Sequence, residues 1–200
     1  YLGRTIDIHT GGEDNKFPHH EAEIAQSECA SGKPFARLWL HVTHLLVDGE
    51  KMSKSKGNFY TLNDLVAKGS ALRDVRYLLL ATHYRQQLNF TWSGLESAKG
   101  ALARLDDFAD ALQSVTPKEK GGADKDAKAA SKAWGKMLDD DLNVPEALSA
   151  LFDLVRKTHE KISAGTLTQT ERQAAIDFLA GTGDALGFSF GRSASDEQIP

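Results

Sequence analysis

The segment Gly49–Asn58 carries the residue types best suited to holding a polyphosphate. It contains Lys51, Lys54 and Lys56, which alternate with two serines on a short stretch bounded by glycines. Ammonium groups on a flexible loop can gather around one polyanion and close on it as its charge shifts during a reaction. Such a run by itself is more often a solvated basic turn. The sequence upstream of it reverses that preference and favours a phosphate-binding loop.

A second candidate site is formed by His19 and Glu23, which lie four residues apart. On a helix the two side chains share one face, where an imidazole and a carboxylate can bind one zinc ion. An exposed ion pair with no ligand is the alternative. The only cysteine, Cys29, lies ten residues after His19, about 80° off that face and about 15 Å along the axis. We therefore expect Cys29 to be a half-buried helix residue, and the remaining zinc ligands to come from elsewhere.

The elements that must position these groups begin with a strand over Thr5–His9, where isoleucines alternate with polar residues. Gly11 and Gly12 are predicted to end this strand and to let the backbone approach a ligand closely. A helix is predicted from His19 to Ala30, with Pro18 at its start and a glycine signal at its end. A strand, a glycine turn and a helix make half of an α/β nucleotide-binding unit. Its ligands lie at the carboxyl end of the strand.

Two long segments together resemble the cysteinyl-tRNA synthetases, which are class I aminoacyl-tRNA synthetases. One segment is Asp7–Glu28, which contains Asp-Ile-His-Thr-Gly-Gly and Phe-Pro-His-His-Glu-Ala-Glu, and the other is Val47–Asn58, which contains Lys-Met-Ser-Lys-Ser. Residues 72–89 and 139–148 are similar to the helical region of that family. The resemblance covers roughly residues 1 to 160 well, and the correct spacing of the two motifs makes it specific.

The resemblance implies an α/β portion followed by an all-α portion. The first is the carboxyl half of a Rossmann-like class I catalytic domain, and the second is a helical stem-contact region with a helix bundle. It also implies a zinc ion that binds the thiolate of the cysteine substrate, with His19 and Glu23 as the matching protein ligands. The family's two cysteine ligands and its His-x-Gly-His signature fall before Tyr1, so we expect the chain to be an internal portion of the enzyme.

The same resemblance assigns catalytic roles in the lysine loop. Lys51 and Lys54 match the two signature lysines, with Lys54 as the first choice for contacting ATP and Met52 beside it in the ATP site. Lys56 is an additional charge of lower rank. Lysines that tighten on the phosphates only in the transition state lower the barrier, whereas equal contact with bound ATP does not.

Upstream, Asp14 matches the carboxylate that accepts hydrogen bonds from the ATP ribose, with Gly12 beside it, and His9 matches a histidine that lies against the amino acid. A helix-entry cap is the alternative for Asp14, and a structural histidine is the alternative for His9. Two positions depart from the family pattern. Thr10 replaces a glycine, which puts the close approach of the backbone in doubt, and Ala22 replaces an asparagine about 100° away from Glu23.

Patterning along the chain predicts the domain organisation. A further strand is expected around Val42 to Val47, and helices are expected at 71–81, 127–138, 144–162 and 168–186. A charged linker with no packing potential is expected between the two helical portions. The predicted divisions are residues 1–60 for the catalytic portion, 61–115 for the stem-contact helices, 116–127 for the linker, 128–190 for the tRNA-binding type of bundle and 191–200 for a flexible tail.

Composition is consistent with this assignment. The formal net charge of −4 argues against DNA binding or coating by nucleic acid, so a tRNA contact requires a local basic face. A single cysteine and the lack of a long apolar run predict a cytoplasmic protein that does not insert in a membrane. The expected partners are tRNA(Cys), ATP with Mg²⁺ as substrate, and L-cysteine, bound by a monomer.

Two other functions remain open from the sequence. The ligase that joins cysteine to an amino sugar in mycothiol synthesis resembles the same catalytic half, but it needs no anticodon-reading helices. A non-catalytic tRNA-binding fragment would use the helical half alone. The long helical portion and the Asp139–Leu148 segment favour the synthetase.

Overall fold

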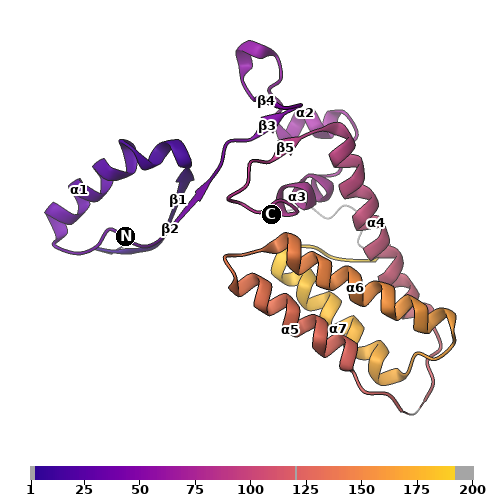
Figure 1. Ribbon diagram of the computed structural model, residues 1–200. Helices are drawn as coiled ribbons and strands as arrows, with labels where there is room; N and C mark the ends of the chain where they lie inside the picture. The colour runs from indigo at the N-terminus through magenta and orange to yellow at the C-terminus, as the bar shows by residue number, and fades with distance from the viewer. Residues whose placement is uncertain (1–2, 120, 192–200) are drawn as a thin grey trace. The chain divides into compact units, whose positions relative to one another are not determined.

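The computed structural model describes residues 3–119 and 121–191, which form two compact units. The first unit comprises the residues up to 59 together with 84–90. The second comprises 60–83 and the residues from 91 onward (Figure 1). Every residue proposed above for chemistry lies in the first unit.

A parallel pair of strands with a helical crossover forms the first part of this unit. Strand β1 (Ile6–Gly12) pairs with β2 (Ala36–Val42), and the connection contains a short 3-10 helix, η1 (Glu13–Lys16), and the helix α1 (His19–Ser31). Parallel strands require a long crossover, and this one supplies it. Helix α1 ends as predicted, with Gly32 in the left-handed region at φ 64°.

Two predictions about these strands need correction. The strand expected around 42–47 is present only at its end, as β3 (Leu46–Val47), because the longer extended segment begins soon after Pro34 and forms β2 (Ala36–Val42). The break expected at Gly11 and Gly12 is absent, because the ladder continues there with Gly11 opposite His41 and Gly12 opposite Val42.

A small second sheet carries the lysine loop. Strand β3 pairs antiparallel with β4 (Glu50–Lys51) and parallel with β5 (Asn89–Phe90). The two-residue turn Asp48-Gly49 has φ values of 51° and 80°, which is the conformation that matches the twist of a tight hairpin. The Asn89 side chain accepts a hydrogen bond from the Gly49 amide at 2.8 Å. The hairpin thereby brings Lys51 to the start of the loop.

Every regular element named in the described residues of the second unit is a helix. Its helices are α2 (Leu62–Ala67), α3 (Leu72–Leu80), α4 (Trp92–Ser114), α5 (Lys125–Asp139), α6 (Val144–Ser163) and α7 (Gln169–Leu186). The predicted helices are confirmed with ends that differ by two residues or fewer. Thr61 and Thr168 close capping boxes, and Asn143 caps α6, whose first turn contains Pro145. Among residues 3–119 and 121–191, each helix is too short or too polar to span a bilayer.

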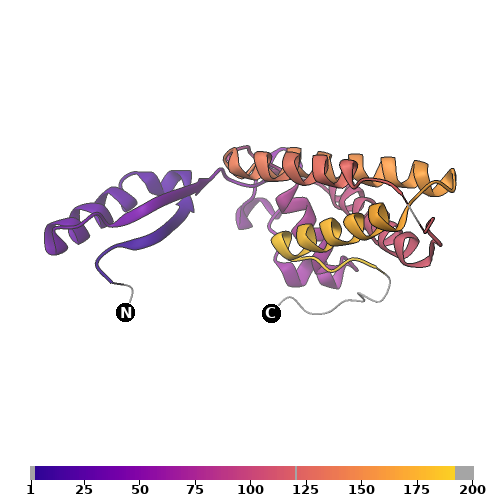
Figure 2. The same ribbon diagram turned by 90° about the horizontal axis from the view of Figure 1, so that it is seen from below.

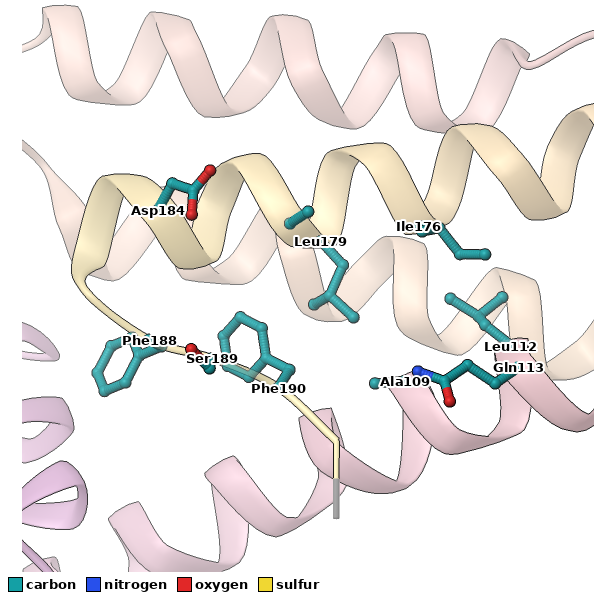
Figure 3. A pocket seen from close by; sticks show the side chains of 10 residues that line it. Ala109, Leu112, Gln113, Ile176, Leu179, Asp184, Phe188, Ser189 and Phe190 are labelled. Carbon is teal, nitrogen blue, oxygen red and sulfur yellow. The ribbon is translucent and has the colours of Figure 1, made fainter. Parts of the chain in front are cut away.

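The core of this unit lies among α4, α5, α6 and α7. Figure 1 shows the last three running side by side, and in Figure 2 the yellow helix α7 lies below the two orange ones. Phe108, Leu105 and Leu151 are fully buried in it. The segment that follows α7 packs back on the bundle, where Phe188 and Phe190 stack with ring centroids 6.0 Å apart. Figure 3 shows these two rings beside a cavity of about 250 Å³ between α4 and α7.

The predicted linker is only partly unpacked. Lys118 forms a bridge to Thr168: its amide donates to the Leu167 carbonyl at 2.9 Å, and its carbonyl accepts from the Gln169 amide at 3.1 Å. The expectation of no packing is therefore wrong at this residue, because the backbone before α7 offers an unpaired edge. The tail predicted at 191–200 lies outside the described residues except for Gly191.

A polar cluster joins three helices of the bundle. The Lys161 ammonium donates to Asp126 Oδ2 at 2.6 Å and to Glu171 Oε1 at 2.8 Å, which connects α6 to α5 and α7. The hydrogen bond from Lys161 holds the pKa of Asp126 below its usual range. Burial acts to raise the pKa of Glu171, but the Lys161 contact and the Thr168 cap outweigh it and the pKa is lowered. The bond to Asp126, followed by that to Glu171, raises the pKa of Lys161.

We predict that Lys161→Met destabilises the bundle at neutral pH by about 1–3 kcal/mol, because two carboxylates are left facing each other. Carboxyls with lowered pKa values contribute stability above their ordinary pKa of about 4, and this contribution is lost as the pH falls below it. Thermal unfolding at pH 6 and pH 3 should therefore show a difference between the native chain and the variant that shrinks at pH 3.

Lys157→Met is the matched control, because Lys157 lies 3.8 Å from Asp126 and is more exposed. It should change the melting temperature little. An equal loss for Lys161→Met at both pH values would show that the ammonium does not act through these carboxylates.

Candidate functional site

Three potential metal ligands from β1 and α1 lie together. The His9 Nε2 atom is 2.8 Å from Glu23 Oε2, and the rings of His9 and His20 have centroids 4.9 Å apart. The ligand atoms of His9, His20 and Glu23 all lie within 4.8 Å of one another. Because β1 and α1 are consecutive parts of one crossover, the strand side chain that faces the helix meets the first turns of that helix. The structure thus brings the predicted residues His9 and Glu23 together.

His20 and His41 are functional candidates that sequence reasoning missed. His20 is buried with 4% of its surface exposed, and its Nδ1 atom lies 2.9 Å from Nε2 of His41 on β2. The Trp39 ring lies next to both His9 and His20, with centroid distances of 4.8 and 5.1 Å. Burial, followed by the charges of Lys16 and His20, lowers the pKa of His41 and favours its neutral form. The sequence signal that could have identified His41 is its position two residues after Trp39, which places both side chains on the same face of β2.

Gly11 is needed for the packing of His20. A Cβ atom at this position would lie 2.7 Å from Cε1 of the His20 ring, which no side chain can tolerate without a shift. Likewise, a Cβ at Gly12 would lie 2.5 Å from Asp14 Oδ1. In this structure the close approach that the sequence assigned to a ligand is made by the protein's own side chains.

His19 lies on the rim of this group. Its Nε2 atom is 3.7 Å from Glu23 Oε1, as the spacing of four residues on α1 requires, and its side chain is 65% exposed. The Glu23 carboxylate is therefore shared, with Oε2 toward His9 and Oε1 toward His19. Cys29 is exposed, so the expectation that it is half-buried is wrong.

Asp14 lies in η1 and is largely exposed, with its Oδ1 atom 3.7 Å from His44 Nε2. The N-cap position of η1 is Gly12, and no side-chain cap bond is made there. Asp14 therefore does not cap this helix, and its carboxylate remains available to hydroxyl donors.

The lysine loop is closed on itself by one amide side chain. Asn58 accepts a hydrogen bond from the Ser53 amide at 2.9 Å and donates one to the Lys51 carbonyl at 3.2 Å. Between them Lys54–Lys56 form a 3-10 turn, η2, that ends at Gly57 with φ 70°. The glycine and the asparagine are therefore what give this run of lysines a defined shape.

The lysines of the loop differ in their surroundings. Lys56 forms an ion pair with Glu50, and this hydrogen bond lowers the pKa of Glu50. The Lys54 ammonium lies 5.3 Å from the centre of the Phe59 ring. Within residues 3–119 and 121–191, neither Lys51 nor Lys54 has a carboxylate within 4 Å. These two ammonium groups are thus open to an anion. No hydrogen bond or ion pair among the described residues joins the loop to the histidine group.

The family described as tRNA synthetases class I (C) catalytic domain matches residues 1–100, which is half of the chain. The chain belongs to this family. The DALR domain family matches residues 133–191 of the same synthetase chain, within the helical unit.

Curated relatives of the synthetase chain are named cysteine–tRNA ligase. The one from Protochlamydia amoebophila is 49% identical over 187 residues, which cover 93% of this chain and 39% of the relative. The one from Chlamydia felis is 47% identical and is matched over 100% of this chain and 42% of its own length. The chain therefore spans about two fifths of the curated relatives it matches.

Solved structures share the fold at low sequence identity. Mycobacterium tuberculosis methionyl-tRNA synthetase in complex with methionyl-adenylate has a TM-score of 0.64 at 20% identity, over 87% of this chain and 39% of its own. The LeuRS of Agrobacterium radiobacter K84 in a ternary complex, LeuRS-tRNA-LeuAMS, has a TM-score of 0.63 at 18% identity, over 86% and 25%. The predicted fold class, an α/β portion of a class I synthetase followed by an all-α portion, is confirmed.

We predict that Asn58→Ala loosens the lysine loop without unfolding the unit. Loss of both hydrogen bonds leaves the Ser53 amide unpaired, so amide hydrogen exchange over residues 51–57 should speed up by about tenfold or more, since a lost hydrogen bond is worth about 1–1.5 kcal/mol. Ser55→Ala is the control, because Ser55 makes only a hydroxyl contact to Ser53 at 3.3 Å. Equal exchange in both variants would rule out the asparagine as the clamp.

Proposed function

We propose that this chain provides the zinc helix, the lysine loop and the helical tRNA-contact portion of a cysteine–tRNA ligase. The reaction joins L-cysteine to tRNA(Cys) in two steps with ATP. The observation that carries the proposal is the identity of 46–49% to cysteine–tRNA ligases over nine tenths or more of the chain. In the first step a carboxylate oxygen of cysteine bonds to the α-phosphorus of ATP, and pyrophosphate leaves. In the second, a hydroxyl of the terminal ribose of tRNA takes the cysteinyl group and AMP leaves.

Lys51 and Lys54 stabilise the departing pyrophosphate. Charge accumulates on its oxygens as the bond to the α-phosphorus breaks, and an ammonium that tightens on it then lowers the barrier. Support comes from the loop itself, where these two lysines lack the ion pair that occupies Lys56. Met52 lies between them in the ATP site. Breaking the Lys54–Phe59 contact is a small cost, because an exposed cation–π contact is worth about 0.5–1 kcal/mol.

Asp14 and Gly12 hold the nucleoside. The exposed Asp14 carboxylate accepts hydrogen bonds from the two ribose hydroxyls, and Gly12 leaves room for Asp14 Oδ1 against the backbone. His9 lies against the amino acid and also binds Glu23 Oε2. This second contact turns the other Glu23 oxygen toward His19, which is the role a neighbouring donor plays for a metal-binding carboxylate.

The side chains at the start of α1 fit a zinc ion. His19 and Glu23 present one nitrogen and one oxygen 3.7 Å apart on a reachable surface, and imidazole and carboxylate are ordinary zinc ligands. Such an ion supplies a soft site for the cysteine thiolate and discriminates against the serine hydroxyl. Two cysteine ligands beyond this chain complete the set. His20, which is buried against Gly11 and His41, serves as support for this group.

The partners follow from the reaction. ATP enters with Mg²⁺ as substrate, and the helical unit, which matches the DALR family over 133–191, contacts tRNA(Cys). The enzyme works as a monomer in the cytoplasm, where its substrates are. If the acceptor were an amino sugar instead, the reaction would not require a tRNA-contacting helical unit.

Lys54→Ala, made in the full product of the gene, should slow cysteine-dependent exchange of pyrophosphate into ATP by about 10²–10³, the range for removal of one transition-state donor. Thermal stability should change little, because Lys54 is exposed and makes only the ring contact. Lys56→Ala in the same loop is the control and should cost less than about threefold. Transfer of cysteine to an amino sugar but not to tRNA(Cys) would instead assign the other ligase function.

Zinc content provides a second test. His19→Ala and Glu23→Ala should each lower the zinc affinity of the full product by about tenfold or more. Elemental analysis after dialysis should then find less zinc per molecule than in the unchanged protein. His20→Ala should retain zinc and lower thermal stability, because its buried ring would leave a void against Gly11. Loss of zinc in His20→Ala with retention in His19→Ala would assign the ion to the inner trio His9, His20 and Glu23.

A further inference from the structure

We infer that the exposed face of α5 binds the phosphate backbone of an RNA strand through Lys125, Lys128, Lys132 and Lys136. All four lysines are exposed. The inference deepens the proposed function, because it rests on that function for the identity of the RNA as tRNA. These four residues are called the lysine row below.

The row is straight along the helix. Its members are separated by three, four and four residues, so at about 100° per residue they fall within an arc of about 80° and extend over about 16 Å. Single-strand phosphates repeat every 3.4 Å along a duplex, so a row of this length spans several of them. Scattered surface lysines would not share one direction in this way.

The opposite face of α5 is buried in the bundle. Ala127, Ala130 and Trp134 are buried, and the Trp134 ring meets Phe178 of α7 edge-on, with ring centroids 6.1 Å apart. Helix α5 is therefore held by α6 and α7 (Figure 1), while the four lysines of the row are exposed. A ligand could reach the row without any change in the bundle.

Small residues flank the row on both sides. On one side lie Ser131 and Gly135, and on the other lie Ala129 and Ala133. At about 100° per residue these positions are the direct neighbours of the lysines around the helix. A ridge of lysines on a smooth helix allows a strand backbone to come close, because no bulky side chain stands in its way.

The charges of the row are mostly uncommitted. Among the described residues, Lys125, Lys132 and Lys136 have no carboxylate within 4 Å, and Lys128 alone is paired, with Asp124 at 3.0 Å. Asp139 bounds the row at the end of the helix.

Other cations of the helical unit are engaged in its structure. Arg73 makes two bonds to Asp106, Arg172 donates to the Leu112 carbonyl, and Lys161 joins two carboxylates. The row therefore concentrates positive charge that folding does not use, on a chain whose net charge is −4.

An RNA backbone fits this surface better than a lipid surface does. Membrane-binding amphipathic helices present a large apolar face next to their lysines, whereas the large apolar residues of α5, Trp134, Met137 and Leu138, pack in the bundle. Lysine contacts to phosphates are sequence-independent, and each one releases counterions, which gives a measurable dependence on salt.

The test compares two triple variants of the 200-residue chain with the same change of charge. Lys125, Lys132 and Lys136 are changed to Gln in one variant. In the control, Lys99, Lys118 and Arg156, which are exposed cations off the row, are changed to Gln. Filter binding of tRNA(Cys) transcript is measured from 50 to 300 mM salt, with circular dichroism to verify that each variant is folded.

The row variant should bind at least tenfold more weakly at 100 mM salt, and the slope of log affinity against log salt should fall by about 2–3, at 0.7–0.9 per phosphate contact. The control should change the slope by less than about 1. Arginine at the three row positions should restore binding. Equal losses in both triples, or none in the row variant, would overturn the inference.

Failure of the inference and failure of the proposed function can be told apart. If the full product charges tRNA(Cys) with cysteine while the row variant keeps its affinity and slope, the inference about the lysine row is wrong and the proposed function is supported. If no cysteine is transferred but the row variant loses RNA affinity, the inference is supported and the proposed function is wrong. Selective loss of binding to phosphatidylserine vesicles, with tRNA binding unchanged, would assign the row to a lipid surface and overturn the inference.

Discussion

The shared carboxylate of Glu23 is the contact on which the rest of the first unit depends. One Glu23 oxygen is held by His9 on β1, and the other faces His19 on α1. The carboxylate therefore links β1 to α1 and also presents an oxygen that can bind a metal ion. This arrangement requires Gly11, because any side chain there would meet the ring of His20. The packing of α1 against β1 and the geometry of the candidate zinc site therefore depend on the same contacts.

The lysine loop shows a different way of giving shape to charged residues. A run of three lysines would repel itself and stay open, but a two-residue hairpin turn sets its beginning and the Asn58 side chain closes it. An ion pair takes up Lys56 and leaves Lys51 and Lys54 for an anion. The helical unit repeats this division, since some of its cations secure the fold while the row on α5 faces outward.

Sequence reasoning succeeded where the signal is local. The helices α1, α3, α5, α6 and α7 were predicted to within two residues, because their caps and apolar periods lie inside each segment. The pairing of His19 with Glu23 likewise needs only the pitch of one helix. It failed for strand Ala36–Val42 and for the bridge of Lys118 to Thr168, because backbone pairing depends on a partner distant in the chain.

The sequence by itself determined the family, the helical boundaries and which residue types could hold zinc and phosphate, because these depend on residue identity and spacing. Only the tertiary structure decided that His20 and His41 lie behind His9 and Glu23, that Gly11 makes room for the His20 ring, and that Lys56 is paired with Glu50. Each of these results from side chains that meet across elements, and their meeting is set by the register of β1 on β2 and by the hairpin.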